Sequence, residues 1–329
     1  MDLRTRFLGL DLRTPIMPGA SPLADDLDGV RRLEDAGAPA IVLRSLFEEQ
    51  IVAEQESTLE ALEARPISPE AATWLPTPRE LVFGTDAYLE QLRRVKAAVS
   101  VPVLSSLNGV TAGGWLEHAR LMEQAGADAR ELNVYDLAVD PAETSEVVEQ
   151  RVKDIVVRVK ASVRIPVAVK LSPFFSSIPH LAVELERAGA DGLVVFNRFY
   201  QPDIDPVLLE AVPRLHLSDP SELLLRLRWL AILRPRVALS LAATGGVHSG
   251  QDAVKAVMAG ADAVQVTSVL LRHGPMYLRI LENQLRAFMD QNEYESIGQM
   301  KGSMSHAHCP DPRAFERANY MRVLQSWRG

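Results

Sequence analysis

The chain has 329 residues, of which 47% are hydrophobic and 24% charged, and its net charge at pH 7 is −8. This is the composition of a soluble globular protein, and the negative charge argues against nucleic acid or an anionic membrane as the main partner. Cys309 is the single cysteine, which excludes an intramolecular disulfide and a cysteine-based metal cluster. The N-terminal segment is interrupted by charge and no segment is apolar enough to span a bilayer, so we expect a cytoplasmic protein.

Short apolar runs and amphipathic helical patterns alternate along the chain. Eight runs are predicted as strands: Pro15–Pro18, Ala40–Leu43, Val101–Ser105, Ala129–Val134, Val167–Leu171, Gly192–Phe196, Val237–Leu241 and Ala263–Val266. The predicted helices between them include Leu27–Ala36, Ala87–Val99, Gly114–Ala125, Ser145–Ser162 and Pro179–Ala188. Most strands are continuous apolar runs, as parallel strands buried on both faces should be. The pattern predicts an α/β fold, a TIM (β/α)₈ barrel that forms one domain over residues 1–329.

The tripeptide Ala-Gly-Ala supports this reading, because it recurs at residues 36–38, 125–127, 188–190 and 259–261. Each copy closes a helical pattern and precedes a short apolar run. Glycine is favoured just past a helix C-terminus, and small neighbours let a helix and a strand pack closely. The irregular spacing of the copies favours βα units that carry insertions over a solenoid.

Two long insertions interrupt the series of βα units, Glu48–Glu80 after strand 2 and Arg198–Pro220 after strand 6. Both leave the carboxyl ends of strands, where barrel enzymes build their sites, so we expect walls or lids there. Surface decoration and an oligomer contact are the alternatives. The tail from Gly298 to Gly329 has no strand signal, and Pro312–Trp327 is a candidate terminal helix. The tail also contains His306, His308 and Cys309, which we interpret as part of a loop and not as a metal site.

Polar residues at the strand ends are the first functional signal. Arg44-Ser45 follows strand 2, and Asn133, Lys170 and Asn197 stand at the ends of strands 4, 5 and 6. Burying such groups costs free energy unless a partner is present. Lys170 lies between Val169 and Leu171, so we expect it to meet an anion.

The stretch Ala242–Ser268 is the second signal. Its first strand runs into Thr244-Gly245-Gly246, a helix follows near Ser249, and its second strand runs into Thr267-Ser268. Paired glycines let backbone N–H groups approach a ligand, and the positive end of the following helix favours an anion. Two such neighbouring strand ends match the phosphate site of a TIM barrel, built after strands 7 and 8. A plain tight turn is the alternative.

From about Thr14 to Pro275 the chain resembles the dihydroorotate dehydrogenase family, most closely its soluble class 1 branch. The specific matches are ELN at Glu131–Asn133, VKLSP at Val169–Pro173, Asn197, and the TGG, SGQDA, GAD, VQV and HGP motifs between Thr244 and Pro275. The resemblance implies an FMN-dependent oxidoreductase that acts on CH–CH donors in pyrimidine biosynthesis, with FMN lying across the mouth of the barrel.

The resemblance also assigns roles to individual residues. It implies that Lys170 sits at the electron-accepting edge of the flavin, with Asn133 and Asn197 serving the flavin and substrate region. Backbone at Gly19-Ala20-Ser21 and Ser106–Gly109, including Asn108, would line the ring, and Arg44-Ser45 stands where the family has Lys-Ser. The phosphate would bind to Gly245, Gly246, Thr267 and Ser268.

The substrate side departs from the family. Asp136 takes the position of the catalytic base, a cysteine in class 1 and a serine in the membrane-bound branch, and the proline-asparagine pair after it is missing. The substrate loop with Asn-Leu-Gly is also absent after strand 2. We also expect no membrane-anchoring extension like that of the quinone-using branch. We therefore expect weak or no turnover of dihydroorotate and a preference for another reduced compound.

Two other functions stay open at this point. A Schiff-base lyase of the aldolase type would use Lys170 with a phosphorylated substrate, but it leaves Asn133 and Asn197 without a role. A flavin-carrying electron-transfer or accessory protein would have lost its ancestral substrate. Besides a small-molecule substrate, a second copy of the chain and an electron-transfer protein are candidate partners.

Overall fold

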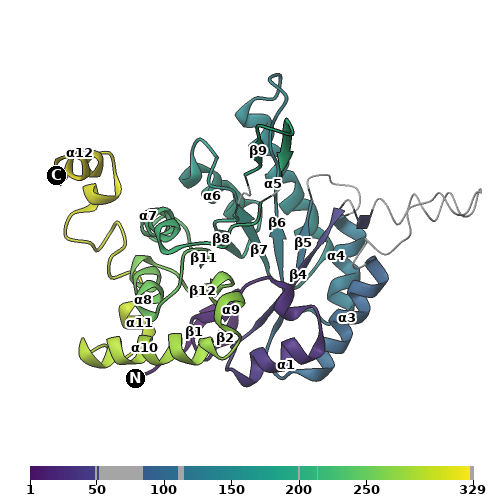
Figure 1. Cartoon of the computed structure of the whole chain (residues 1–329), viewed down its shortest axis with the longest axis horizontal. Coiled ribbons are helices and arrows are strands. Elements are labelled where there is room, and N and C mark those ends of the chain that lie inside the picture. Colours follow the sequence, from purple (N-terminus) through teal and green to yellow (C-terminus); the bar gives the residue numbers. More distant parts are fainter. Residues whose placement is uncertain (49, 52–83, 110–114, 199–200, 213, 327–329) are drawn as a thin grey trace, which may run out of the picture.

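The computed structural model describes residues 1–48, 50–51, 84–109, 115–198, 201–212 and 214–326 (Figure 1). Eight parallel strands form one sheet in the order β3-β12-β11-β8-β7-β6-β5-β4. Their bounds are β3 Ile16–Pro18, β4 Ile41–Phe47, β5 Val103–Asn108, β6 Ala129–Asn133, β7 Val167–Leu171, β8 Gly192–Val195, β11 Ser240–Thr244 and β12 Ala263–Val266. The end strands β3 and β4 contact each other, so the sheet curls into a nearly closed barrel. The predicted TIM barrel is confirmed.

Helices surround the strands (Figure 1). The α-helices are α1 Leu27–Asp35, α3 Thr85–Ala98, α4 Trp115–Gln124, α5 Ser145–Ser162, α6 Ile178–Arg187, α7 Leu223–Leu233, α8 Gly250–Ala259, α9 Ser268–His273, α10 Tyr277–Gln291, α11 Ile297–Met300 and α12 Ala318–Ser326. The 3₁₀ turns are η1 Pro22–Ala24, η4 Pro220–Glu222 and η5 Pro312–Phe315. The bounds of α5 match the prediction, because the Thr144 side chain caps its first turn and buried valines and an isoleucine recur at helical spacing.

The start of β11 lies furthest from its predicted position, and β5 also lies later in the chain than the predicted Val101–Ser105. The apolar run Val237–Leu241 predicts a strand, but β11 starts at Ser240. The backbone N–H of Val237 donates to Leu233 O at 3.2 Å, and that of Ala238 donates to Glu186 Oε1 at 2.7 Å. These two N–H groups are therefore used outside the sheet, and the strand runs directly into Gly245.

The amino-terminal end of the barrel is filled by a hairpin that the sequence pattern does not predict. Its strands are β1 Thr5–Phe7 and β2 Leu10–Leu12. Phe7, Leu8 and Leu12 pack inside the barrel against apolar side chains of the strands. A Cβ on Gly192 would lie 2.9 Å from the backbone oxygen of Ser240 as well as 2.6 Å from Leu8 Cδ2, so glycine lets the hairpin and the neighbouring strand pack closely there. Because this hairpin fills the amino-terminal end of the barrel with apolar side chains, the polar side chains inside the barrel lie toward the carboxyl ends of its strands.

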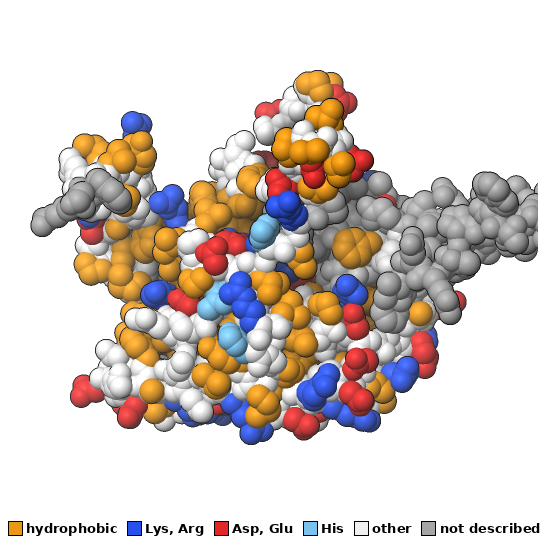
Figure 2. Space-filling model, viewed as in Figure 1, with side chains coloured by type: hydrophobic (Ala, Val, Ile, Leu, Met, Phe, Trp, Pro, Cys, Tyr) orange, Lys and Arg blue, Asp and Glu red, His pale blue; other side chains and the backbone are white. Residues whose placement is uncertain are grey.

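The predicted insertion after the sixth barrel strand contains a second hairpin, β9 Asp203–Asp205 and β10 Glu210–Val212. Figure 2 shows hydrophobic side chains gathered on this projection, and the exposed ones include Ile204, Val207, Leu208 and Leu209. The other predicted insertion, Glu48–Glu80, falls almost wholly outside the described residues. The predicted terminal helix is divided into η5 and α12.

Among the residues that the structure describes, none of the helices has the length and apolar character needed to cross a membrane.

Candidate active site at the carboxyl ends of the strands

Four of the predicted site residues lie together at the carboxyl ends of adjacent strands. Asn108 pairs in register with Asn133, and Asn133 pairs with Lys170, across β5, β6 and β7. Asn197 follows β8 and donates from Nδ2 to Asn133 Oδ1 at 2.7 Å, while its backbone N–H donates to Leu171 O at 2.8 Å. The register and these hydrogen bonds hold the four side chains in one polar layer.

Lys170 has a partner that the sequence pattern alone does not single out. Its Nζ donates to Glu131 Oε1 at 3.0 Å, and Gln265 Nε2 donates to Glu131 Oε2 at 2.7 Å. Lys170 meets an anion, as expected, and the chain itself supplies it as the carboxylate of Glu131. Glu131 precedes Asn133 by two residues, so both face the same side of β6. This alternation is the signal that could have identified Glu131.

Arg44 and Ser45 lie within β4, not after it, and they contact different parts of the barrel. The register of β4 against β5 shifts between Val42 and Ser45. Ser45 Oγ lies 2.7 Å from Ser106 Oγ on the next strand. The Arg44 side chain is 45% exposed and pairs with Asp25 at 2.8 Å. The charge of Arg44 is therefore already compensated within the chain.

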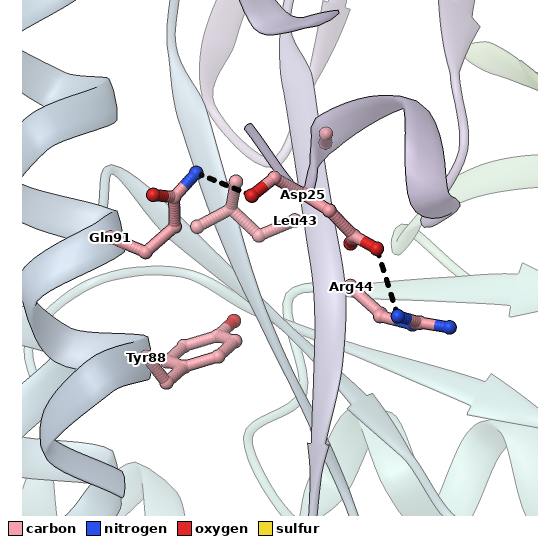
Figure 3. Close-up of a pocket in the computed structure, with 6 residues that line it drawn as sticks. Asp25, Leu43, Arg44, Tyr88 and Gln91 are labelled. Carbon is pink, nitrogen blue, oxygen red and sulfur yellow. Dashed lines mark hydrogen bonds and ion pairs between the residues drawn. The ribbon is translucent and has the colours of Figure 1, made fainter. Parts of the chain in front are cut away.

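Figure 3 shows Arg44 at a small cavity with Asp25, Leu43, Tyr88 and Gln91. Burial raises the pKa of Asp25, the charge of Arg44 opposes this, and the charge of the neighbouring Asp26 adds to it. The cavity volume is about 20 Å³, which holds about one water molecule. A ligand pocket usually measures about 300 Å³ or more, so this cavity is not a cofactor site.

The two strand ends predicted to bind a phosphate are neighbours in the barrel. β11 and β12 pair in parallel, and Gly245-Gly246 and Thr267-Ser268 follow them directly. Gly245 and Gly246 have φ angles of 90° and 79°, a conformation that favours glycine. The structure therefore brings together the four residues to which the resemblance assigns the phosphate.

Ser218, from the insertion after β8, joins this region without a signal in the sequence. Its backbone N–H and its hydroxyl both donate to Ser268 Oγ, at 2.9 and 2.8 Å. His248 contributes a buried Nε2 atom that has no hydrogen-bond partner. Burial lowers the pKa of His248 and the charge of Arg272 lowers it further, against smaller opposing effects of Ser218, Asp252 and Asp219.

The expectation that the positive end of α8 is available to an anion needs correction. The Ser249 hydroxyl accepts from the backbone N–H of Asp252, and Asp252 Oδ2 accepts from those of His248 and Ser249, at 3.1 and 3.0 Å. The N–H of Gly250 donates to Gln284 Oε1 at 2.6 Å. Side chains of the protein therefore occupy this helix terminus.

Packing also explains why glycines follow β11. A Cβ on Gly246 would lie 2.3 Å from the backbone nitrogen of Leu223, at the start of α7, and one on Gly245 would lie 3.0 Å from Arg226 Nη2. Arg226 is buried, and its Nε donates to Thr244 O at 2.9 Å. The fold needs both glycines whether or not a phosphate binds beside them.

Asp136, at the position of the expected base, is bound by an arginine. Arg151 of α5 forms ion pairs with both Asp136 and Glu143. Although desolvation lowers the pKa of Arg151, the hydrogen bonds to Glu143 and Asp136 raise it overall. The Asp136 side chain is 17% exposed. The carboxylate thus shares its cation with a second acid, a relationship that the sequence spacing does not reveal.

The backbone after β3 lies against the end of β12. The N–H of Gly19 donates to Val266 O at 3.0 Å, and a Cβ on Gly19 would lie 2.7 Å from Thr267 Oγ1. Ala20 and the buried Ser21 follow directly. The segment assigned to the flavin ring is therefore adjacent to the segment assigned to the phosphate.

These residues fit the FMN that the resemblance implies. The mouth combines a polar layer on four strands with two adjacent strand ends that carry glycine and hydroxyl groups. Two buried polar atoms, Gln265 Oε1 and His248 Nε2, lack a hydrogen-bond partner, and buried polar groups are usually satisfied. In the described part of the chain, three or more His, Cys, Asp or Glu side chains do not gather in a way that could hold a metal ion.

Comparison with known proteins agrees with this site. The family model of dihydroorotate dehydrogenase matches residues 82–289. A protein named dihydroorotate dehydrogenase B (NAD(+)), catalytic subunit, from Thermoplasma volcanium is 28% identical over 318 residues, 92% of this chain and 98% of that protein. Proteins of the same name from Thermoplasma acidophilum and Pyrococcus abyssi are both 29% identical, cover 92% and 91% of this chain, and are themselves covered to 98%.

The matched residues include β5 to β12 and all of the strand-end groups described from Asn108 to Ser268. The chain therefore belongs to the dihydroorotate dehydrogenase family, whose members are FMN-dependent flavoprotein oxidoreductases that act on CH–CH donors in pyrimidine biosynthesis.

Proposed function

We propose that this protein transfers a hydride between a small CH–CH substrate, dihydroorotate or a related compound, and N5 of bound FMN. The observation that carries the proposal is the polar layer at the barrel mouth, made by Asn108, Asn133, Lys170 and Asn197. Strand register places Asn108, Asn133 and Lys170, and a hydrogen bond joins Asn197 to Asn133. Donors placed in advance stabilise developing charge without reorganising during the reaction.

The proposal gives each group one task. Binding of the phosphate is assigned to the backbone and hydroxyl groups that follow β11 and β12, namely Gly245, Gly246, Thr267 and Ser268. Ala20, Ser21, Ser45 and Asn108 line the flavin ring, with Arg44 near its edge. When bound, the flavin supplies the hydride acceptor that protein side chains lack. Lys170, Asn133 and Asn197 orient the reactants and provide hydrogen bonds and positive charge.

Asp136 is the candidate base that removes a proton from the carbon next to the hydride donor. Arg151 forms an ion pair with this carboxylate and so orients it. The same ion pair competes for the oxygen that must accept the proton. Because Arg44, Lys170 and Arg151 all have acidic partners in the chain, we propose a substrate less acidic than dihydroorotate.

The ion pair of Lys170 argues against the Schiff-base lyase. A Schiff base forms from a neutral amine, whereas Nζ of Lys170 donates to a buried carboxylate at 3.0 Å. The accessory-protein alternative differs from the proposal only in turnover, so an assay separates them.

We further propose that residues 1–329 act as one cytoplasmic domain that works with an electron-transfer partner protein or as a homodimer. The support for a partner is that several relatives are named catalytic subunits. These names describe the relatives, so an electron-accepting partner is only proposed for this chain.

The test is steady-state oxidation of dihydroorotate by the flavin-loaded protein with fumarate, NAD⁺, a quinone or a dye as acceptor. We expect turnover well below about 1 s⁻¹, the lower end of ordinary enzyme rates, and faster flavin reduction by a less acidic reduced heterocycle. Turnover of about 1 s⁻¹ or more that is lost in Asp136→Ala would show a plain dihydroorotate dehydrogenase. Bound flavin that no reduced compound of this class reduces would favour the accessory protein.

A further inference from the structure

Glu131 is a buried acid to which the proposed reaction gives no direct task. Its side chain is 1% exposed, and both carboxylate oxygens are used, Oε1 by Lys170 Nζ and Oε2 by Gln265 Nε2. Gln265 is fully buried, and its Oε1 has no hydrogen-bond partner. An ionised carboxylate only accepts hydrogen bonds. The NH₂ group of Gln265 must therefore face Glu131, and this orientation leaves Gln265 Oε1 without a hydrogen-bond partner.

The charge of Glu131 cancels that of Lys170 at close range. The two groups are 3.0 Å apart, and the Lys170 side chain is 11% exposed. A buried ion pair persists when hydrogen bonds satisfy its remaining atoms, and the amide of Gln265 does this for Glu131. Seen from the barrel mouth, the pair acts more like a dipole than like a lone ammonium. A negatively charged group at the mouth thus gains less from Lys170 than from an unpaired lysine.

Resting on the proposed function, we propose that Glu131 is a positioning residue that fixes the Lys170 ammonium and offsets its charge. It thereby keeps the reduction potential of the bound flavin more negative than Lys170 alone would set it. Gln265 supports this arrangement from β12 by holding the second carboxylate oxygen. Glu131 acts on the cofactor through Lys170 and need not touch it.

The direct test is the midpoint potential of the flavin-loaded Glu131→Gln variant. The new side chain has the same shape, its carbonyl can accept from Lys170, and rotation of the Gln265 amide lets the unsatisfied Oε1 accept from the new NH₂ group. We expect the fold and the flavin to be retained and the equilibrium constant for reduction to rise about tenfold, or about 30 mV for a two-electron couple. Lys170→Met should shift the potential in the opposite direction.

Glu184→Gln is the matched control, because Glu184 pairs with Lys153 on the helical outside of the barrel at 3.9 Å. It should leave the reduction equilibrium within about twofold of wild type. A potential of flavin-loaded Glu131→Gln that is unchanged or more negative would overturn the proposal. A merely structural role of Glu131 would give no such directed shift.

A double variant covers the case in which Glu131→Gln does not fold. Glu131→Met with Lys170→Met removes both charges, so its potential should stay within about threefold of wild type in equilibrium constant. A shift as large as that of Lys170→Met alone would overturn the proposal.

Chemical unfolding of the flavin-free protein is an independent readout. Lys170→Met leaves the Glu131 charge buried without its partner and should lower the folding equilibrium constant at least about a hundredfold, whereas the double variant should recover most of this loss. Additive effects of the two substitutions would overturn the coupling. A wild-type protein that binds no flavin would contradict the proposed function, and this unfolding cycle would still decide whether the pair exists.

Discussion

The carboxylate of Asp136 is bound by the guanidinium of Arg151, which also binds Glu143. One arginine thus binds two acidic side chains, of which only Asp136 is the candidate base. If Asp136 is the base, its loss removes proton transfer, whereas loss of Glu143 removes only a second partner of Arg151. The two carboxylates therefore offer a matched pair of variants.

We predict that Asp136→Asn slows reduction of the flavin by the true substrate about 10²- to 10⁴-fold, the usual contribution of a general base. Flavin content should not change, since the assigned cofactor contacts lie on other residues. Glu143→Gln should slow the reaction less than about tenfold. Single-turnover reduction followed by flavin absorbance measures both. Equal losses in the two variants would mean that Asp136 only supports Arg151.

Gly246→Ala should destabilise the fold more than Gly9→Ala. The φ angles are nearly equal, 79° and 76°, but a Cβ on Gly246 would lie 2.3 Å from the nitrogen of Leu223, and one on Gly9 would meet nothing within 4 Å. An alanine at positive φ costs about 1–2 kcal/mol, and overpacking adds about 1–3 kcal/mol. Denaturant unfolding of the two variants without cofactor measures the difference. Equal losses would show that α7 can move away from Gly246.

His248 should make the folded state less stable as the pH falls from about 7 to 5. Its pKa is lowered in the folded protein, chiefly by burial, while an unfolded histidine titrates near about 6.5. Below that pH the unfolded chain binds the proton more readily, so its contribution to stability is present above about pH 6.5 and is lost on acidification.

Unfolding free energies of wild type and His248→Gln over this pH range test the prediction. The variant should show a weaker pH dependence, and His180→Gln, at an exposed position, should follow the wild type. Parallel curves for all three proteins would remove His248 as the source.

The sequence predicts much of the fold because the helices and most strands are defined by local patterns. Ser145–Ser162 has a cap and a helical apolar stripe, and α5 has the same bounds. The β1–β2 hairpin is missed because it consists of two three-residue strands, too short for a period of two to stand out. β11 is displaced because Val237 and Ala238 find hydrogen-bond partners on α7 and Glu186, which lie elsewhere in the sequence.

The candidate site likewise contains residues that the sequence predicts and partners that it does not predict. Asn133, Lys170 and Asn197 are predicted because each ends an apolar run, and strand register then brings them together. Partners that come from another strand or helix are not predicted: Glu131 for Lys170, Arg151 for Asp136 and Asp25 for Arg44. Charge compensation is decided by these tertiary contacts, so the sequence shows where the cations stand but not how much of their charge is available.

Flavin content of the purified protein is the most direct test of FMN binding at the barrel mouth. We expect a yellow protein with a flavin absorption spectrum, whose cofactor is released on denaturation and has the mass of FMN, not FAD. Ser268→Asp, which puts a negative charge at the assigned phosphate position, should lower retained FMN at least about tenfold, while Ser326→Asp on α12 should not. A folded protein that is colourless and does not take up added FMN would show that the barrel mouth is not a flavin site.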